Sequence, residues 1–305
     1  MGSENFRASV LMVVSMVLFA FEDMFIKLMS EGLPYTQVLF IIGLLGLPMF
    51  WIALVARGGR LFTRDLLHPM VLLRNAGEVV GSLGIVAALA LSPLASTSAL
   101  MQALPLAIVI GAAVFLREPV GWRRWLAIGV GVGGVLLILR PGLSTFQPTS
   151  VIALVAVTGF AVRDLATRRI PAHIPSMQLA ASAFLALLIA AGVAAVVLGQ
   201  RFVAPSLLTC AYSIACVAVG VTAYAMIVAA TRLGEASAIA PLRYVRLVTA
   251  LVLAVIVFGE RPDAPTLIGA AIIVGSGGYA MWREAVRRRR LLRTTTLPRG
   301  TTRRV

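Results

Sequence analysis

Ionisable side chains lie inside long apolar runs of this sequence, where they are costly. On membrane-insertion scales such a group costs about 2.5–3.5 kcal/mol near the middle of a helix, so it normally faces a cavity or a charged partner. Arg74 and Glu78 are four residues apart and therefore share one helical face. They could form an internal ion pair or contact a bound solute, and the sequence leaves both alternatives open.

A second group of charges contains only cations. Arg243 and Arg246 are three residues apart beside Tyr244, and their own apolar run offers no acidic partner. Two guanidinium groups on one face form a fork that suits a carboxylate or a phosphate, and Tyr244 adds an amphipathic surface. The alternative is a static ion pair with Asp164 or Glu22.

Two pairs of adjacent residues suggest gates. Glu22 and Asp23 lie in the first apolar run, and Arg163 and Asp164 lie in the sixth. We expect Asp164 with a neighbouring arginine to help close the inner side of a pathway. We expect Asp23, with Gln102 nearby, to help close the outer side.

The candidate site residues therefore form two sets. Those expected to contact a solute are Arg74, Glu78, Gln102, Tyr224, Arg243, Tyr244 and Arg246. Those expected to act in gating or coupling are Glu22, Asp23, Arg163 and Asp164. A membrane-embedded enzyme would need a catalytic set such as a Ser/His pair, a metal cluster or paired aspartates, and none is recognisable. The two histidines lack the spacing of a metal site, so we expect no catalytic residue, no metal and no cofactor.

Composition indicates what must position these charges. The chain has 305 residues, of which 60% are hydrophobic and 13% charged, and its mean hydropathy is +0.96. Its apolar residues fall in runs of about 20, the length of a helix that crosses a bilayer. These runs lack the alternation of barrel strands, so the sequence predicts an all-α integral membrane protein. Ten transmembrane helices are expected, at 8–29, 36–56, 68–91, 94–116, 122–140, 150–169, 175–198, 206–230, 235–258 and 265–282.

The formal net charge of +15 has a topological explanation. The arginines lie at the ends of apolar runs and in the tail, not in a patch with interleaved aromatic residues, so we expect no nucleic acid as a partner. With the N-terminus in the cytoplasm, nine arginines fall in cytoplasmic connections and only four basic residues fall on the other side, which follows the positive-inside rule. The tail with Arg287, Arg288, Arg289 and Arg290 is then also cytoplasmic, and we interpret it as a solvated topology anchor.

The sequence also repeats itself. A shift of 141 residues places Asp23 on Asp164, Lys27 on Arg168, and Gln37 on Gln178. With one inserted residue, a shift of 142, Glu118 falls on Glu260. Each half holds five expected helices, an odd number, so the halves cross the membrane in opposite directions. We predict a first five-helix repeat at 1–142, a second at 143–284 and a basic cytoplasmic tail at 285–305.

Two stretches resemble a known family. Residues 91–96 through Arg117-Glu118-Pro119, and 236–241 through Gly259-Glu260-Arg261-Pro262, look like the paired signature of EamA-type transporters of the drug/metabolite transporter superfamily. The resemblance covers nearly the whole chain, although Arg-Glu-Pro stands at 117–119 where Gly-Glu is commoner. It implies ten helices in two inverted repeats and the transport of amino acids, vitamins, nucleotide-like compounds or other metabolites.

These observations predict a secondary transporter that moves a small polar metabolite, such as an amino acid, by alternating access. Export is the expected direction. The alternatives are an importer of a vitamin or nucleotide-like metabolite, and, from other classes, a membrane-embedded enzyme or a non-transporting sensor.

The expected partners are the small-molecule substrate and the lipid bilayer. The glycine-rich fifth and tenth runs offer a surface for a homodimer, which nothing in the sequence requires. With one lysine and 26 arginines, by subtraction from the 27 basic residues, the chain is typical of a GC-rich bacterial genome, so we expect it in the bacterial cytoplasmic (inner) membrane.

Overall fold

The computed structural model describes residues 3–117, 121–143, 147–233 and 239–295, and within these ranges it is helical with no strand. The helices are α1 (Ser3–Ser30), α2 (Tyr35–Val55), η1 (Arg64–Leu67), α3 (Pro69–Leu91), α4 (Leu94–Met101), α5 (Leu104–Phe115), α6 (Trp122–Leu139), α7 (Ser150–Thr167), α8 (Ser176–Val197), α9 (Leu207–Leu233), η2 (Ala240–Tyr244), α11 (Val245–Phe258) and α12 (Ala264–Thr295). The all-α prediction is confirmed, and most helix ends fall within a few residues of the expected ones.

The helices have the length and polarity of membrane spans. In the described part of the chain, eight helices or helix pairs are long and apolar enough to cross a bilayer, and the shorter apolar segment Ala264–Ala280 adds to them. Large apolar side chains such as Ile52, Val196 and Ile256 are exposed on the outside of the bundle, where acyl chains would cover them. The fold is that of a multi-pass membrane protein.

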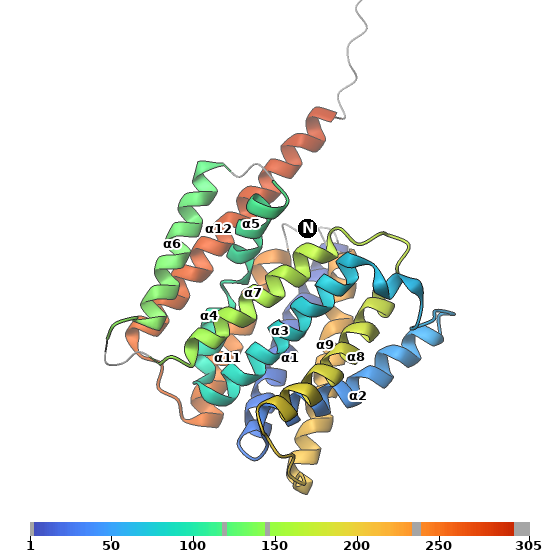
Figure 1. The fold of residues 1–305 in the computed structure, drawn as a ribbon. Helices are drawn as coiled ribbons and strands as arrows, with labels where there is room; N and C mark the ends of the chain where they lie inside the picture. Colours follow the sequence, from blue (N-terminus) through green and yellow to red (C-terminus); the bar gives the residue numbers. More distant parts are fainter. Residues whose placement is uncertain (1–2, 118–120, 144–146, 234–238, 296–305) are drawn as a thin grey trace, which may run out of the picture.

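Helices of the two halves pack against each other in a symmetric pattern (Figure 1). The most extensive contacts join α3 to α7, α1 to α9, α2 to α8 and α6 to α12. Exchanging the halves turns α1 into α7 and α3 into α9, so the α3–α7 pair becomes the α9–α1 pair. The other two pairs map onto themselves. The contacts therefore obey the two-fold relation of an inverted repeat.

Two glutamines show the same symmetry in hydrogen bonds. The Gln37 side chain donates to the carbonyl of Val203 (2.6 Å) and accepts from its N–H (2.8 Å). Its repeat partner Gln178 donates to the carbonyl of Leu61 (3.2 Å) and to Thr63 (2.7 Å). Each glutamine thus anchors the loop that follows the second helix of the other half. We propose the boundary between the halves at residues 142 and 143.

Two of the expected spans are interrupted within their length, which the sequence prediction did not include. The run 94–116 is divided into α4 and α5 at Gln102 and Ala103. In the run 235–258, the described part begins at Ile239, contains the 3-10 helix η2 and continues as α11 from Val245, while 234–238 lie outside the described residues. Since Gln102 corresponds to Arg243 in the repeat, the breaks occupy equivalent positions, and each brings a polar residue to an interruption of the helix.

The last helix extends beyond its expected end. We predicted a span to residue 282 and then a solvated tail, but α12 continues to Thr295. Figure 1 shows this helix projecting from the bundle at the end where the N-terminus lies. We call this the N-terminal end of the bundle. Residues 296–305 of the predicted tail lie outside the described residues.

Candidate functional site

Glycines bring α3 and α7 into backbone contact. A Cβ atom at Gly77 would lie 2.7 Å from the backbone N of Arg163 and the carbonyl O of Gly159. Gly81 and Gly159 also meet backbone to backbone. Gly77 and Gly81 form the small-xxx-small spacing that allows membrane helices to approach closely. This approach places Arg163 of α7 beside Glu78 of α3.

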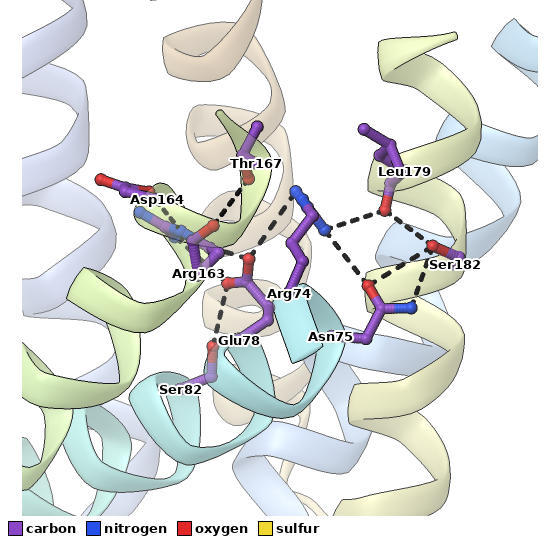
Figure 2. A network of polar contacts seen from close by, with 9 residues as sticks. All are labelled: Arg74, Asn75, Glu78, Ser82, Arg163, Asp164, Thr167, Leu179 and Ser182. Carbon is purple, nitrogen blue, oxygen red and sulfur yellow. Dashed lines mark hydrogen bonds and ion pairs between the residues drawn. The ribbon is translucent and has the colours of Figure 1, made fainter. Parts of the chain in front are cut away.

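A chain of alternating charges results (Figure 2). Arg163 Nε donates to Asp164 Oδ1 at 2.8 Å, and Arg163 Nη1 lies 3.4 Å from both oxygens of Glu78. On the other side of Glu78, Arg74 Nη2 lies 4.0 Å from Oε2. The four side chains carry two positive and two negative charges, so the chain is neutral as a whole. Arg163 also lies 4.5 Å from the ring centroid of Phe160.

Arg74 links this chain of charges to α8. Its Nη1 donates to the carbonyl oxygen of Leu179 at 3.1 Å, and the neighbouring Asn75 Nδ2 donates to Ser182 Oγ at 3.2 Å. Arg74 Nε is buried, and it has no hydrogen-bond partner among the residues that the structure describes. Arg74 and Glu78, which could pair or contact a solute, are thus both engaged in a network that ties three helices together.

Asp23 and Arg246 form a separate, bidentate ion pair. Arg246 Nη2 lies 2.7 Å from Asp23 Oδ1, and Nε lies 2.9 Å from Oδ2. The Asp23 side chain is 6% exposed and that of Arg246 is 29% exposed. The pair joins α1 of the first half to α11 of the second. Such a buried pair is strongly destabilised when one partner is removed.

The expected arginine fork does not form. Arg246 is occupied by Asp23, which is neither of the carboxylates that we considered as partners. Arg243, one helical turn earlier, is exposed, and within the described ranges no carboxylate lies at ion-pair distance from it. Among the residues that the structure describes, Arg243 thus has no ion-pair partner, although Asp164 and Arg163 lie close enough to influence it.

Glu22 is the corresponding anion. In the repeat it takes the place of Arg163, but Val219 takes the place of Glu78, so the charged partner is missing. Its carboxylate packs directly on Gly220 of α9, where a Cβ atom would collide with it. Across the described residues no hydrogen bond or ion pair of this carboxylate occurs, although it lies near Asp23 and Arg246.

Three further candidates lie in different surroundings. Gln102 is buried at the break between α4 and α5. Tyr244 is also buried, its hydroxyl packs on Gly277 of α12, and it has no hydrogen-bond partner in the described structure. Tyr244 is therefore buried, whereas the adjacent Arg243 is exposed. Tyr224 packs edge-on against Phe50, with ring centroids 5.4 Å apart.

An apolar cavity of about 730 Å³ lies beside Tyr224 near the N-terminal end of the bundle. It is bordered by the last turns of α2 and α9 and the first turn of α8. Its lining includes Phe50, Met177, Tyr224, Val228 and Arg57. Tyr224 also lies near Arg74, so it lies between the apolar cavity and the charged network.

Sequence reasoning missed two further charged residues that are engaged across the halves. Lys27 of α1 lies 3.6 Å from Glu260, which follows α11. The signal was present, because the repeat already aligned Lys27 with Arg168 and Glu260 with Glu118. Helix-end charges at equivalent positions of both halves indicate a shared structural role.

A protein-family model of EamA-like transporters matches residues 6–140 and 147–277. The chain belongs to the EamA-like transporter family. This EamA-like chain therefore has the two-repeat fold of the drug/metabolite transporters and is not an enzyme.

Characterised relatives of this EamA-like chain are transporters. It is 26% identical over 196 residues to the S-adenosylmethionine uptake transporter of Rickettsia bellii, a match that covers 64% of this chain and 66% of the relative. The match thus spans just under two thirds of that relative's length. The pseudopaline exporter of Pseudomonas aeruginosa is 27% identical over 271 residues, with coverage of 87% and 92% respectively. A riboflavin transporter of Rhizobium johnstonii is 41% identical over 66 residues, 21% of this chain and 22% of that one.

The fold also matches a solved crystal structure of a protein. The TM-score is 0.60 at 20% sequence identity, over 92% of this chain and 99% of the other. At this identity the likeness bears on the fold alone.

Proposed function

We propose that this protein is a secondary transporter that carries a zwitterionic solute, an amino acid or a related compound, by alternating access. The observation that carries this proposal is that two charged residues, Arg243 and Glu22, have no ion-pair partner among the residues that the structure describes. Every other core cation described above has a carboxylate partner. A solute that carries both a carboxylate and an ammonium group would satisfy both.

The proposed binding mode follows from the chemistry of each side chain. The planar guanidinium of Arg243 can donate two parallel hydrogen bonds to a carboxylate. Glu22 can accept hydrogen bonds from an ammonium group, which makes it a binding residue in place of the gating role expected from the sequence. A neutral or singly charged solute would leave one membrane-embedded charge without a partner, at a cost of a few kcal/mol.

The inverted repeat supplies the means of movement. Two halves that cross the membrane in opposite directions can exchange conformations, so that a site between them opens alternately to each side. We propose that Asp164 with Arg163, near the end of α7, acts in the inner gate. Arg74 and Glu78 hold this gate to α3 and α8.

The direction of transport and the topology are also proposals. The names of the relatives include both uptake and export, and a carrier of this kind follows the gradients of its solutes. We propose export for an amino acid, with both termini in the cytoplasm of a bacterial inner membrane. The homodimer stays a prediction.

A second candidate function is supported by the apolar cavity beside Tyr224. Its volume of about 730 Å³ is within the range of sites for drug-sized ligands, about 300–1,000 Å³. Phe50 and Tyr224 offer aromatic surfaces to a flat ring system. A vitamin or a nucleoside-bearing metabolite could place its ring there and its charged groups toward Arg74.

Counterflow in proteoliposomes tests the proposal. Vesicles preloaded with one unlabelled solute are diluted into the labelled form, for a panel of amino acids, dicarboxylates, amines, flavins and nucleosides. We expect transient accumulation of a zwitterion in wild-type vesicles and its loss with Arg243→Gln. Accumulation of flavins or nucleosides alone would favour the second candidate, and accumulation of no solute above empty vesicles would contradict both.

A further inference from the structure

Four helix ends from both halves meet at the end of the bundle opposite the N-terminus. The Glu260 carboxylate, just after α11, accepts hydrogen bonds from the backbone N–H groups of Leu94 (2.6 Å) and Ala95 (2.9 Å). These are the first N–H groups of α4, which have no partner within their own helix. A carboxylate from the second half thus caps a helix of the first half, where the helix dipole also favours a negative charge.

Lys27 completes this contact from the end of α1. Its Nζ donates to the carbonyl oxygens of Ser92 (2.8 Å) and Leu89 (3.3 Å) at the end of α3. It also lies 3.6 Å from Glu260 Oε1 and 5.3 Å from the ring centroid of Phe258. The side chains of Lys27 and Glu260 are only 16% and 14% exposed.

This contact separates a polar depression from an apolar layer. On one side is a depression of about 490 Å³ whose lining includes Lys27, Ser92, Thr149 and Glu260. Packed beside these groups are apolar side chains that are fully buried, among them Leu89 and Leu94. They belong to a core cluster to which α1, α3, α4 and α11 all contribute. The polar contact therefore lies at the boundary between solvent and the closed bundle.

We propose that Lys27 and Glu260, with the start of α4, form a latch that holds the solute pathway shut at this end and opens once in each transport cycle. The inference rests on the proposed alternating access. For the pathway to open here, α11 must move away from α1 and α4, and the bonds of Glu260 to Leu94 and Ala95 must break. The latch differs from the outer gate predicted at Asp23 and Gln102 and consists of other residues.

The same end of the bundle offers a matched control. Arg140, after α6, pairs with Asp263, which precedes α12. Those two helices meet backbone to backbone, because a Cβ atom at Gly134 would lie 2.8 Å from the carbonyl oxygen of Gly269. An ion pair between helices packed so closely does not report on the opening of a pathway.

Thiol labelling tests the latch without any solute. The native cysteines are both free and are replaced by Cys210→Ser and Cys216→Ala. Ser98, which is 4% exposed on α4, is then changed to the reporter, Ser98→Cys. A membrane-impermeant maleimide is applied to vesicles of each orientation, so that labelling from the Lys27 end and from the N-terminal end is measured separately.

We expect Glu260→Ala to raise the labelling rate from the Lys27 end about tenfold, since it removes two charge-assisted hydrogen bonds and an ion pair. Lys27→Met, which keeps the cap, should raise it several-fold and carries the test if Glu260→Ala does not fold. Asp263→Asn should leave the rate unchanged. A parental rate in the folded latch variants, or an equal rise with Asp263→Asn, would overturn the latch.

The outcome is separable from that of the proposed function. Faster labelling from the Lys27 end in a protein that shows no counterflow of a zwitterion would support the latch and contradict the proposed class of solute. Counterflow by a protein whose latch variants label at the parental rate would contradict the latch alone.

Discussion

Gly77→Ala should separate α3 from α7 and thereby weaken the charged network. The added Cβ would lie 2.7 Å from two backbone atoms of α7, whereas ordinary contact begins at 3.4 Å. Relief therefore requires the helices to move apart by about 0.7 Å, the difference between these distances. The 3.4 Å contact between Arg163 and Glu78 would then exceed ion-pair distance. Overpacking of this kind costs about 1–3 kcal/mol.

A second glycine controls for the intrinsic effect of the substitution. Alanine favours a helix over glycine by about 0.5–1 kcal/mol, and a Cβ at Gly133 of α6 would have no atom within 4 Å. Gly133→Ala should therefore keep or raise the melting temperature in detergent. Gly77→Ala should lower the melting temperature and slow counterflow. Equal melting temperatures for the two variants would refute the close helix contact as the feature that positions Arg163.

Three further predictions concern single charges. Asp23→Asn should destabilise the fold by up to about 3 kcal/mol, because it leaves the partly buried Arg246 without its carboxylate partner. The double variant with Arg246→Gln should lose less than the sum of the single losses in detergent unfolding, and additive losses would contradict the pair. Arg140 holds the pKa of Asp263 at about 2, below its usual 3.8, so the stabilisation by Asp263 is complete above about pH 3.8 and is lost as the pH falls toward 2. The difference in melting temperature between wild type and Asp263→Asn should shrink over that interval, and a constant difference would contradict it. Glu22→Gln should reduce counterflow of a zwitterion more than it changes the melting temperature; unchanged counterflow would remove Glu22 from the site.

The sequence predicted the helices well because lipid imposes one strong requirement. Every backbone amide in hydrocarbon needs an internal partner, so each apolar run of sufficient length becomes a helix that ends near its turn residues. The expected run 36–56 is α2 at Tyr35–Val55, and 122–140 is α6 at Trp122–Leu139. The repeat was visible as well, through Asp23 and Asp164.

The breaks in the helices were missed, although proline marks both. Pro105 lies in the first turn of α5 and Pro241 in the first turn of η2. Proline has no backbone N–H group, so the carbonyl oxygen four residues earlier lacks the donor that a continuous helix would supply. The apolar residues continue without interruption across these prolines. A prediction based on the length of apolar runs therefore gave single helices.

Pairing between charges was harder to predict than their presence. Spacing within a helix placed Arg243 and Arg246 on one face, but it contains no information on which other helix approaches. Where α1 crosses α11, Arg246 forms an ion pair with Asp23. Arg243 has no ion-pair partner among the described residues. The contact of Lys27 with Glu260 likewise depends on tertiary packing across the halves.

The central claim, that Arg243 is the open anion-binding group of a zwitterion carrier, is tested most directly by counterflow of a transported amino acid against its carboxamide. The carboxamide keeps the ammonium group and the side chain but lacks the negative charge. We predict that wild-type protein prefers the free acid by at least about tenfold and that Arg243→Gln abolishes this preference. Equal transport of acid and amide by wild type, or a preference that survives in Arg243→Gln, would contradict it.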